Sequence, residues 1–403
     1  MQQKTETPPL KLAIVGAGPV GLSLALHAAR VLPEASVTLF DARPAEKDVS
    51  ADPRTLALSL GSVQLLQRLG AWRPELAQAI LEVHVSQQAP SLPALLGDWL
   101  GEPELRIRAS DEAVPLLGAV MSYGNIVAPL QHEWFTAERA EPRRLSSRFG
   151  QPVSALKPVE RGVEVDAGIA ERFDLVVVAE GGVFSDQVRK AVTHDYQQTA
   201  WVGHVGFEDT STPRPRGVAF ERFTRVGPAA LLPLKDGAAG LVWCVPSNDD
   251  PVRELNDAQR VTVLNSIFHP GVGRIASITA LKHFPLGLNA ERTLTDGRTV
   301  RIGNAAQTLH PVAGQGLNLG LRDAFELVQA LSRNPDIDAV LRKLEWQRSP
   351  DRWAMIAATD FLARSFTWRL PGAGAARGLG LAALQLITPL KSALARQMMF
   401  GSR

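Results

Sequence analysis

The residues with the clearest chemical purpose are the glycines of an N-terminal stretch, KLAIVGAGPVGLSLALHAARV. Gly16, Gly18 and Gly21 follow a short apolar run and open a helical pattern, and Asp41 ends a second apolar run. Glycines at this spacing permit a tight turn, close approach of a pyrophosphate and close packing of the helix, and an acid about 20 residues later can bind a ribose hydroxyl. This pattern predicts a dinucleotide site of the Rossmann type.

A second glycine-rich loop lies far along the chain, in RIGNAAQTLHPVAGQGLNLGLRD, and leads into an apolar run at helical spacing. Glycines there let a flat ligand approach the backbone, and the N–H groups that open a helix carry its positive dipole end. Such a helix start suits a ring that becomes negative when it is reduced. The residues expected to contact that ring are Ala313, Gly314, Gln315, Gly316, Leu317 and Asn318.

Both motifs stand among further stretches that resemble the single-component flavin monooxygenases. These stretches are ADPRTLALSLGSVQLLQRLGAW (51–72), GVAFERFTRVGPAALLPLKDG (217–237), LVWC (241–244) and FPL (284–286). The chain is most similar to the ubiquinone-biosynthesis branch, in particular the 2-polyprenyl-6-methoxyphenol hydroxylases, and the resemblance runs from Lys11 to about Gly401. It implies an FAD-dependent aromatic hydroxylase.

The resemblance also implies the cofactors and the substrates. FAD would be bound tightly but non-covalently, with NAD(P)H as a transient electron donor, and no second Gly-x-Gly-x-x-Gly occurs for the nicotinamide cofactor. O2 and a prenylated phenol would react through a flavin C4a-hydroperoxide. Arg54 takes the place of a family arginine near FAD, where its fork could hold two phosphate oxygens, and a surface ion pair is the alternative.

Two FAD motifs depart from the family pattern. The usual Gly-Asp-Ala-Ala-His is replaced by GNAAQ at 303–307, and we expect Asn304 to hydrogen-bond a ribose or ribityl hydroxyl without bringing a charge. The usual Asp-Gly-x-x-Ser is replaced by GGVFS at 181–185, with Glu180 one position early. The family's aspartate therefore has no counterpart at its own position.

His310 and Pro311, just before the second glycine loop, are the candidate catalytic pair. In the implied mechanism His310 is the titratable residue placed to take the proton of the phenol or to hydrogen-bond its oxygen. The alternative is that His310 only hydrogen-bonds the backbone of a tight loop.

Composition narrows the function classes. The 403 residues are 45% hydrophobic and 21% charged, as expected for a soluble globular protein of two or three domains. A net charge of +2, without basic residues interleaved with aromatics, argues against nucleic acid as a partner. Cys244 is the single cysteine and no histidine cluster occurs, so we expect no disulfide and no metal site. We expect a cytoplasmic protein, with peripheral contact to the inner membrane surface as a further expectation.

The element pattern and the resemblance predict an α/β fold of the p-hydroxybenzoate-hydroxylase type, with interleaved domains and C-terminal helices. A discontinuous Rossmann-type FAD-binding domain would comprise 1–85, 119–191 and 287–335. An antiparallel-sheet substrate domain would comprise 86–118 and 192–286, and 336–403 would be helical. FDLVVVAE (173–180) is typical of a strand in the middle of a parallel sheet.

Several finer expectations follow from the same patterns. The apolar spacing predicts a helix from Thr55 to Gly70, a strand and then a short helix within 123–140, a helix over 317–333, and another over 337–369 interrupted at Pro350. In the substrate sheet, the expected substrate contacts are Phe220, Arg222, Leu232 and Trp243, and core packing is the alternative for each.

The C-terminal tail has an uneven charge distribution. No acidic residue follows Asp360, whereas the basic residues after it are Arg364, Arg369, Arg377, Lys391, Arg396 and Arg403. The apolar positions Ile387, Leu390, Leu394 and Met398 recur at helical spacing, in a run shorter than the roughly 20 residues of a spanning helix. The tail therefore predicts docking on anionic lipid, with packing on the cofactor domain or on a partner protein as the alternative.

Other functions compete with the hydroxylase on the same scaffold. A flavin halogenase would show a Trp-x-Trp-x-Ile-Pro stretch, which this sequence lacks. A prenyl reductase and a hydroxylase of another aromatic substrate are further alternatives. The departures from the FAD motifs also motivate a different class, a non-catalytic flavoprotein that serves as a scaffold among other ubiquinone-biosynthesis proteins.

Overall fold

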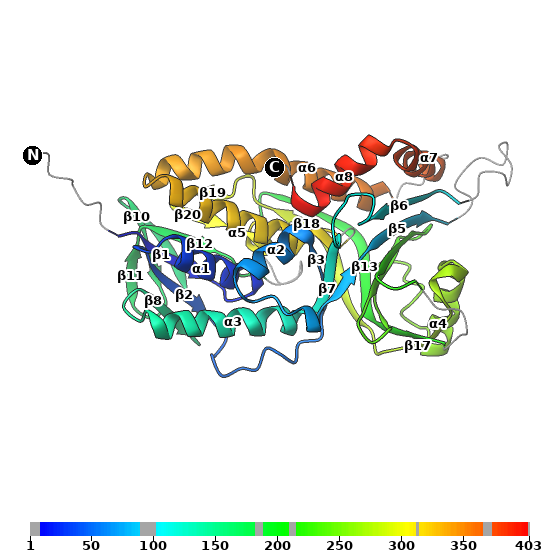
Figure 1. The fold of residues 1–403 in the computed structure, drawn as a ribbon, viewed down its shortest axis with the longest axis horizontal. Helices are drawn as coiled ribbons and strands as arrows, with labels where there is room; N and C mark the ends of the chain where they lie inside the picture. Colours follow the sequence, from blue (N-terminus) through cyan, green and yellow to red (C-terminus); the bar gives the residue numbers. More distant parts are fainter. Residues whose placement is uncertain are drawn as a thin grey trace, which may run out of the picture.

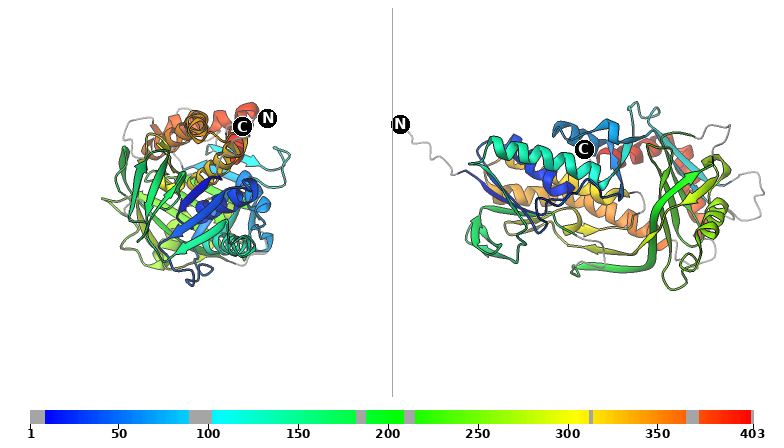
Figure 2. Two further views of the ribbon diagram at one scale, coloured as in Figure 1. Left: turned by 90° about the vertical axis from the view of Figure 1, so that its left-hand side faces the viewer. Right: turned by 90° about the horizontal axis from the view of Figure 1, so that it is seen from below.

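A computed structural model describes residues 9–88, 102–181, 188–208, 215–311, 314–365 and 373–401. A parallel sheet with its helices lies at one end of the molecule and a large, mostly antiparallel sheet lies at the other, with the C-terminal helices running along one side of both (Figure 1). The view from below shows the same end-to-end arrangement (Figure 2, right). The predicted fold class, including the interleaving of the two parts, is confirmed.

The first part is built on a six-stranded sheet in the order β19-β20-β12-β1-β2-β8, parallel except for β19. Its strands are β1 (Lys11–Val15), β2 (Ser36–Asp41), β8 (Leu145–Phe149), β12 (Leu175–Val178), β19 (Thr295–Asp296) and β20 (Thr299–Arg301). As predicted, β12 lies inside the sheet, because its apolar side chains on both faces need cover.

Helices cover one face of this sheet and a small sheet covers the other. The helices are α1 (Pro19–Val31), α3 (Tyr123–Ala140) and α5 (Gln315–Arg333), whose apolar faces share one core with β1, β2 and β12. The small sheet consists of β9 (Ala155–Val159), β10 (Gly162–Asp166) and β11 (Ala170–Phe173), and it packs on the opposite face through Val163, Val165 and Phe173. The central strands are thereby buried on both sides.

A second small sheet joins the two parts of the molecule. It consists of β3 (Thr55–Ser59), β4 (Gln78–Ile80) and β7 (Gly118–Ser122) and is accompanied by α2 (Leu60–Arg68) and the short 3-10 helix η1 (Pro74–Leu76). The predicted helix from Thr55 is wrong in its first turn, because residues 55–59 pair with β7 as a strand and Ser59 then caps α2. The predicted strand at the start of 123–140 is also wrong, since all of 123–140 is helix α3.

The nine-stranded sheet has the order β21-β18-β13-β16-β15-β14-β5-β6, with β17 beside β13. Its strands are β5 (Glu82–Gln87), β6 (Glu104–Arg108), β13 (Val192–Phe207), β14 (Val218–Phe223), β15 (Pro228–Pro233), β16 (Ala239–Pro246), β17 (Ile275–Ile278), β18 (Lys282–Ala290) and β21 (Gln307–Thr308). Only β14 and β5 pair in parallel. Helix α4 (Asp257–Ile267) and the 3-10 helix η5 (Pro270–Val272) lie over the face that points away from the parallel sheet.

Two segments cross the domain boundaries expected from the sequence. Strand β5 begins at Glu82, before the expected boundary at 86, and β21 joins the large sheet from within 287–335. The second crossing matters for the site, because β21 directly precedes His310 and follows the 3-10 helix η6 (Gly303–Ala305). The large sheet thereby reaches the second glycine loop.

The C-terminal helices are α6 (Ile337–Ser365), α7 (Ala373–Leu386) and α8 (Thr388–Phe400). The predicted interruption at Pro350 is wrong, because α6 continues through it. Proline removes the donor for the carbonyl of Trp346, and Trp346 is 78% exposed, so water can replace that donor. No described helix alone is long and apolar enough to span a membrane, although α7 and α8 pass that test together across a bend of 97°.

A buried ionic cluster joins α5, α6 and α8. Asp351 Oδ2 accepts from Arg322 Nη1 at 2.9 Å and from Arg348 Nη1 at 2.7 Å, and Arg348 Nε donates to Asp323 at 2.8 Å. Gln397 Nε2 of α8 donates to the other oxygen of Asp351 at 2.5 Å. Because each of these charges is buried, the cluster is stable only while every member keeps its partners.

We expect Asp351→Ala to lower the free energy of unfolding by about 3–5 kcal/mol, because it leaves buried guanidinium groups without their carboxylate. Asp338→Ala is the control, since Asp338 pairs with Arg298 while 53% exposed and such surface pairs contribute roughly 0–1 kcal/mol. Urea unfolding of both variants measures the difference. Equal losses would show that the cluster does not hold the three helices together.

Candidate functional site

The first glycine loop is built by close backbone contacts. Gly16 has a φ of +105°, and a Cβ added there would lie 2.6 Å from the backbone nitrogen of Glu180. A Cβ on Gly21 would lie 1.8 Å from the carbonyl oxygen of Gly16. The three-glycine spacing therefore lets α1 start directly against the loop, with its N–H groups toward the space in front of β1.

Asp41, the expected ribose ligand, fastens this loop in the structure. Its Oδ2 accepts from the Ala17 N–H at 2.5 Å and its Oδ1 accepts from the Arg43 N–H at 2.7 Å. The Arg43 side chain donates in turn to the carbonyl oxygen of Ala17 at 3.1 Å. The carboxylate thus lies at the end of β2 beside the glycine loop, as its sequence position predicts.

The two divergent FAD motifs meet this loop. Besides the contact of Gly16 with Glu180, a Cβ on Gly181 would lie 2.5 Å from the Cβ of Asn304. Burial, with a smaller contribution from the charge of Asp41, raises the pKa of Glu180. Glu180 stands one position before the family motif in the sequence. Its backbone therefore lies directly against the first glycine loop. The rest of that motif, 182–185, lies outside the described residues.

Gln307, which stands where the family has histidine, has a structural partner. Its Oε1 accepts from Arg352 Nε at 2.6 Å, and Arg352 also donates to the carbonyl oxygen of Glu291. Arg352 is completely buried. A guanidinium from α6 therefore holds the strand that follows Asn304, and the glutamine supplies the acceptor that a buried guanidinium requires.

Helix α5 begins at Gln315, two residues before the predicted start at 317. Gly314 is the residue before the helix and adopts the left-handed region at φ +59°, without a side-chain cap on the first turn. A Cβ on Gly316 would meet no described atom within 4 Å. The first N–H groups of α5 thus face an open space in which a flat ring can approach the backbone. Ala313, also predicted to contact the ring, lies outside the described residues.

The side chain of Asn318 does not face that space. Its Oδ1 accepts from the Ser59 N–H and from Ser62 Oγ, both at 2.8 Å, and its Nδ2 donates to the carbonyl oxygens of Ala57 and Gly314 at 3.0 Å. These bonds use the amide to join α5 to β3 and α2. The predicted role of the Asn318 backbone N–H stays a prediction. The predicted roles of Gln315, which is 6% exposed, and of Leu317 also stay predictions.

Arg54 stacks on Tyr123, and the Tyr123 ring lies beside the first glycine loop. Its guanidinium stacks 4.1 Å from the centre of the Tyr123 ring, and the Tyr123 hydroxyl would lie 3.5 Å from a Cβ on Gly18. The same guanidinium holds Asp52 through Nη2 at 2.8 Å, and this hydrogen bond lowers the pKa of Asp52. The structure thus contains the ion pair that was the alternative, and the contact of Arg54 with a phosphate stays a prediction. Sequence reasoning did not identify Tyr123.

His310 is buried rather than exposed to the solvent. It is 2% exposed, its Nε2 lies 3.0 Å from Gln198 Oε1, and its ring meets the edge of Tyr196 with centres 5.5 Å apart. Burial lowers the pKa of His310 to about 4, so the imidazole is neutral near pH 7. The lowered pKa also makes this imidazole a weak base, because burial disfavours the imidazolium, and the role of His310 as proton acceptor stays a prediction. Pro311 accepts from the Gly314 N–H at 2.9 Å and so shapes the turn between His310 and α5.

The predicted substrate contacts divide between the two faces of the large sheet. Phe220 and Trp243 belong to the cluster beneath α4, and Arg222 donates to the Ile267 carbonyl at the end of that helix at 3.1 Å. The structure thus shows the packing that was the alternative for these three, and their substrate contacts stay a prediction. Leu232 belongs to another cluster, together with Ala57 of β3, and lies beside Gly240, whose Cβ would lie 3.0 Å from Thr55. Substrate contact by Leu232 also stays a prediction.

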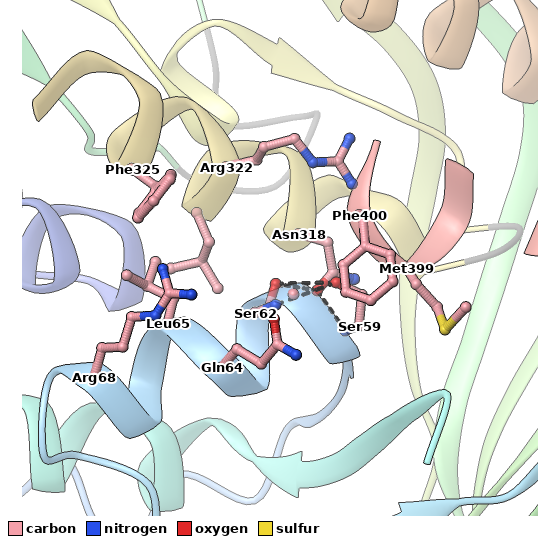
Figure 3. Close-up of a pocket in the computed structure, with 12 residues that line it drawn as sticks. Ser59, Ser62, Gln64, Leu65, Arg68, Asn318, Arg322, Phe325, Met399 and Phe400 are labelled. Atoms are coloured by element: carbon pink, nitrogen blue, oxygen red, sulfur yellow. Dashed lines mark hydrogen bonds between the residues drawn. The ribbon is translucent and has the colours of Figure 1, made fainter. Parts of the chain in front are cut away.

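Two cavities lie in the described part of the chain, one small and one larger. The cavity in Figure 3 has a volume of about 20 Å³ and lies behind Asn318, between α2, α5 and the end of α8. That volume suits a water molecule. A larger cavity of about 440 Å³ lies at the outer end of the large sheet, beside Phe220 and Lys235.

The residues present fit FAD in their donors and in their open space. The glycine loop before α1 and the uncapped start of α5 supply backbone N–H donors to anionic groups, and Asp41 and Asn304 supply acceptors for hydroxyls. Gly316 leaves room that any side chain would occupy. The ends of a dinucleotide could therefore be held by segments about 300 residues apart in the sequence.

Comparison with known proteins agrees with this geometry. The family model described as the FAD binding domain matches residues 10–339. The chain is 30% identical to the ubiquinone hydroxylase UbiL of Rhodospirillum rubrum, over 96% of this chain and 88% of the relative. It is also 30% identical to the 3-demethoxyubiquinol 3-hydroxylase of Escherichia coli, over 95% of this chain and 96% of the relative. The solved structure of Klebsiella pneumoniae HpxO, with FAD and uric acid, has a TM-score of 0.67 at 17% identity over 96% of this chain and 97% of that one, which shows a shared fold.

We expect Gly316→Val to abolish most FAD binding while leaving the apoprotein folded. The added side chain meets no described protein atom within 4 Å, so it fills only the space in front of α5, and the stability should change by about 1 kcal/mol or less. Gly380→Val in α7 is the matched control, because a Cβ there also meets nothing within 4 Å. FAD absorbance after purification and the thermal midpoint of the apoprotein give the two readouts. A yellow Gly316→Val protein with normal FAD content would contradict the placement of the ring at α5.

Proposed function

We propose that this chain, which belongs to the family defined by the FAD binding domain and is an FAD-dependent monooxygenase, acts on a polyprenylated phenol of ubiquinone biosynthesis. It would hydroxylate the ring of this phenol with NAD(P)H and O2. The observation that carries the proposal is the pair of glycine loops at the uncapped starts of α1 and α5, where FAD would bind. Two relatives of nearly full length that are named as ubiquinone-pathway hydroxylases support the substrate class.

Bound FAD supplies the electron transfer and the oxygen activation of this reaction. The chain's own residues bind the cofactor, exclude water and move the proton of the substrate. Backbone N–H groups at Gly316 and Leu317 would stabilise negative charge on the ring, and Gly16, Gly18 and Gly21 would leave room for the pyrophosphate. The polar groups of FAD between its ring and its pyrophosphate would be held by Arg54, Asp41 and Asn304.

The inward face of the large sheet suits an apolar substrate. Val202, Val242 and Leu309 pack in one cluster with Cys244, and Leu232 packs in the neighbouring one. A surface of this kind excludes water and favours an aromatic ring with a hydrocarbon tail over a charged substrate. A hydroxylase of another aromatic compound is the alternative, and it would also bind FAD.

Hydroxylation of a prenylphenol by the FAD-bound protein separates these functions. We expect NAD(P)H oxidation that the prenylphenol stimulates and a hydroxylated product, and we expect His310→Ala to slow hydroxylation about 100-fold because it removes a general base. Flavin reduction, followed by stopped flow, should be unchanged. His132→Ala, on the exposed surface of α3, is the control.

Absence of stimulation by the prenylphenol would contradict the proposed substrate, and turnover of an unprenylated phenol alone would favour another aromatic substrate. Equal slowing of reduction and hydroxylation in His310→Ala, or no slowing of either, would contradict the role of His310.

We further propose peripheral contact with the inner membrane surface through the bend between α7 and α8. One side of this pair packs on the protein, since Ala395 and Met399 are buried and Gln385 accepts from the Arg106 N–H at 3.0 Å. The other side exposes apolar side chains at and around the bend, namely Leu379, Leu386, Ile387 and Leu390. Both the packing and the docking expected for the tail are therefore compatible with the same two helices.

The charge of the tail is partly neutralised within the protein. Lys391 lies 3.7 Å from Asp111, and Arg396 lies 3.7 Å from Glu112. Electrostatic attraction to anionic lipid is therefore weaker than the basic residues alone suggest, and insertion of apolar side chains has to contribute. The alternative to lipid is another ubiquinone-biosynthesis protein that binds at the same bend.

We expect the double variant Leu386→Glu with Ile387→Glu to sediment less with anionic liposomes than the unaltered protein, at low and at high salt. Leu386 is 81% exposed, so a charge there should not disturb the fold but should oppose insertion. Ile169→Glu is the control, because Ile169 is 84% exposed on the turn between β10 and β11. Equal sedimentation of all three proteins would rule out the bend as the membrane contact.

A further inference from the structure

We infer that the outer face of α6 between Trp346 and Ala358 is a second membrane contact, which lies flat on an anionic lipid bilayer. The inference rests on the membrane contact proposed for the bend between α7 and α8, and it extends that contact to a helix that the proposal does not use. Among the described helices α6 is the longest, at 29 residues. It runs along the same side of the molecule as α7 and α8 (Figure 1; Figure 2, left).

The middle of α6 turns its charged side chains inward. Arg348, Asp351 and Arg352 are 4%, 2% and 0% exposed, and they form the buried contacts with α5 and with the strand after Asn304. A surface helix ordinarily has the reverse arrangement, with apolar residues inside and charged residues outside. The charges of this stretch therefore do not hydrate its outer face.

The outer face of the same stretch is almost entirely apolar. Its exposed positions are Trp346, Gln347, Pro350, Ala354, Ala357 and Ala358. Trp346 is 78% exposed, and no exposed position between residues 346 and 358 carries a charge. A continuous exposed apolar face of this kind marks a site of contact with a membrane or with another protein.

The charges at the two ends of this face favour lipid over a second copy of the chain. One turn before Trp346, Arg342 and Lys343 are exposed, and neither forms an ion pair with the described residues. At the other end Asp360 pairs with Arg364 at 2.9 Å, so an antiparallel pair of α6 helices would offer these cations no net negative charge. A parallel pair would bring the cations of both copies together. Anionic headgroups, in contrast, can receive both cations.

The order of residues on this face suits the boundary between water and lipid. Tryptophan prefers the level of the headgroups, and helices that lie in this plane place cations beside their apolar face. Pro350 leaves the carbonyl of Trp346 without its helical donor, and water is available to that carbonyl among the headgroups but not in the hydrocarbon core. The helix should therefore lie in the headgroup region. Together with the bend, it would fix the orientation of the protein on the bilayer.

A fluorescent label tests the contact directly in the FAD-bound, full-length protein without substrate. Cys244 is the single cysteine and is 1% exposed, so a cysteine introduced at the surface can be labelled selectively. We expect an environment-sensitive label on Ala354→Cys to brighten and shift to shorter wavelength with vesicles of phosphatidylglycerol and phosphatidylcholine. Ala258→Cys is the matched control and should not respond, because Ala258 is an exposed alanine of α4, away from the C-terminal helices (Figure 1).

Charge provides the second readout. We expect Arg342→Ala with Lys343→Ala to weaken binding to these anionic vesicles about tenfold and to leave binding to phosphatidylcholine alone unchanged. FAD content and the thermal midpoint of the variant should match those of the unaltered protein, since both side chains are exposed.

The outcomes separate the possible occupants of the face. A silent label on Ala354→Cys, in protein that sediments with the vesicles, would overturn the inference and leave the bend as the membrane contact. A label response that grows with protein concentration without vesicles would also overturn it, because a second copy would then cover the face. The label is read without substrate, so failure of the prenylphenol as substrate leaves this test intact.

Discussion

The close contact between α1 and α5 is the constraint on which the site depends. Gly320 of α5 has no side chain, and a Cβ there would lie 2.7 Å from the Cα of Gly303 and 2.9 Å from the side chain of Val20. Each helix starts at one of the two glycine loops, so this contact sets the distance between two helix starts that bind anions. A cofactor that spans both loops needs that distance to be constant, and close-packed helices provide a rigid one.

The C-terminal half of the chain reinforces this arrangement through charges buried beneath the site. Arg352 holds the strand after Asn304, and the cluster around Asp351 joins α6 to α5 and α8. Gln307, which replaces the family histidine, accepts a hydrogen bond from the buried guanidinium of Arg352. A histidine could accept this bond in one tautomer only, whereas an amide oxygen always accepts. The departure that motivated a non-catalytic scaffold therefore has a structural explanation.

The large sheet separates two environments by the alternation of its side chains. Phe220, Trp243 and Arg222 support α4 on the outer face, whereas Leu232 and the residues around Leu309 form the apolar inner face. A bulge in β13 interrupts this alternation at Gln197, and it brings Tyr196 and Gln198 to His310. The sheet thus provides an apolar inner face and the two residues that contact the His310 ring.

The sequence alone determined what depends on contiguous residues. The glycine loops, the acid at the end of β2, the buried strand β12 and the open start of α5 follow from local spacing, because turn geometry and helix dipoles involve only neighbouring backbone groups. Strand register decided which face of the sheet each strand residue occupies, because a shift of one position moves every side chain to the other face. Phe220 and Trp243 therefore lie on the outer face, whereas Leu232 lies on the inner face. Pairs such as Arg54 with Tyr123 and His310 with Gln198 were decided only by the tertiary structure. Their partners lie far apart in the chain, and no periodicity or spacing relates side chains that meet only when separate elements pack together.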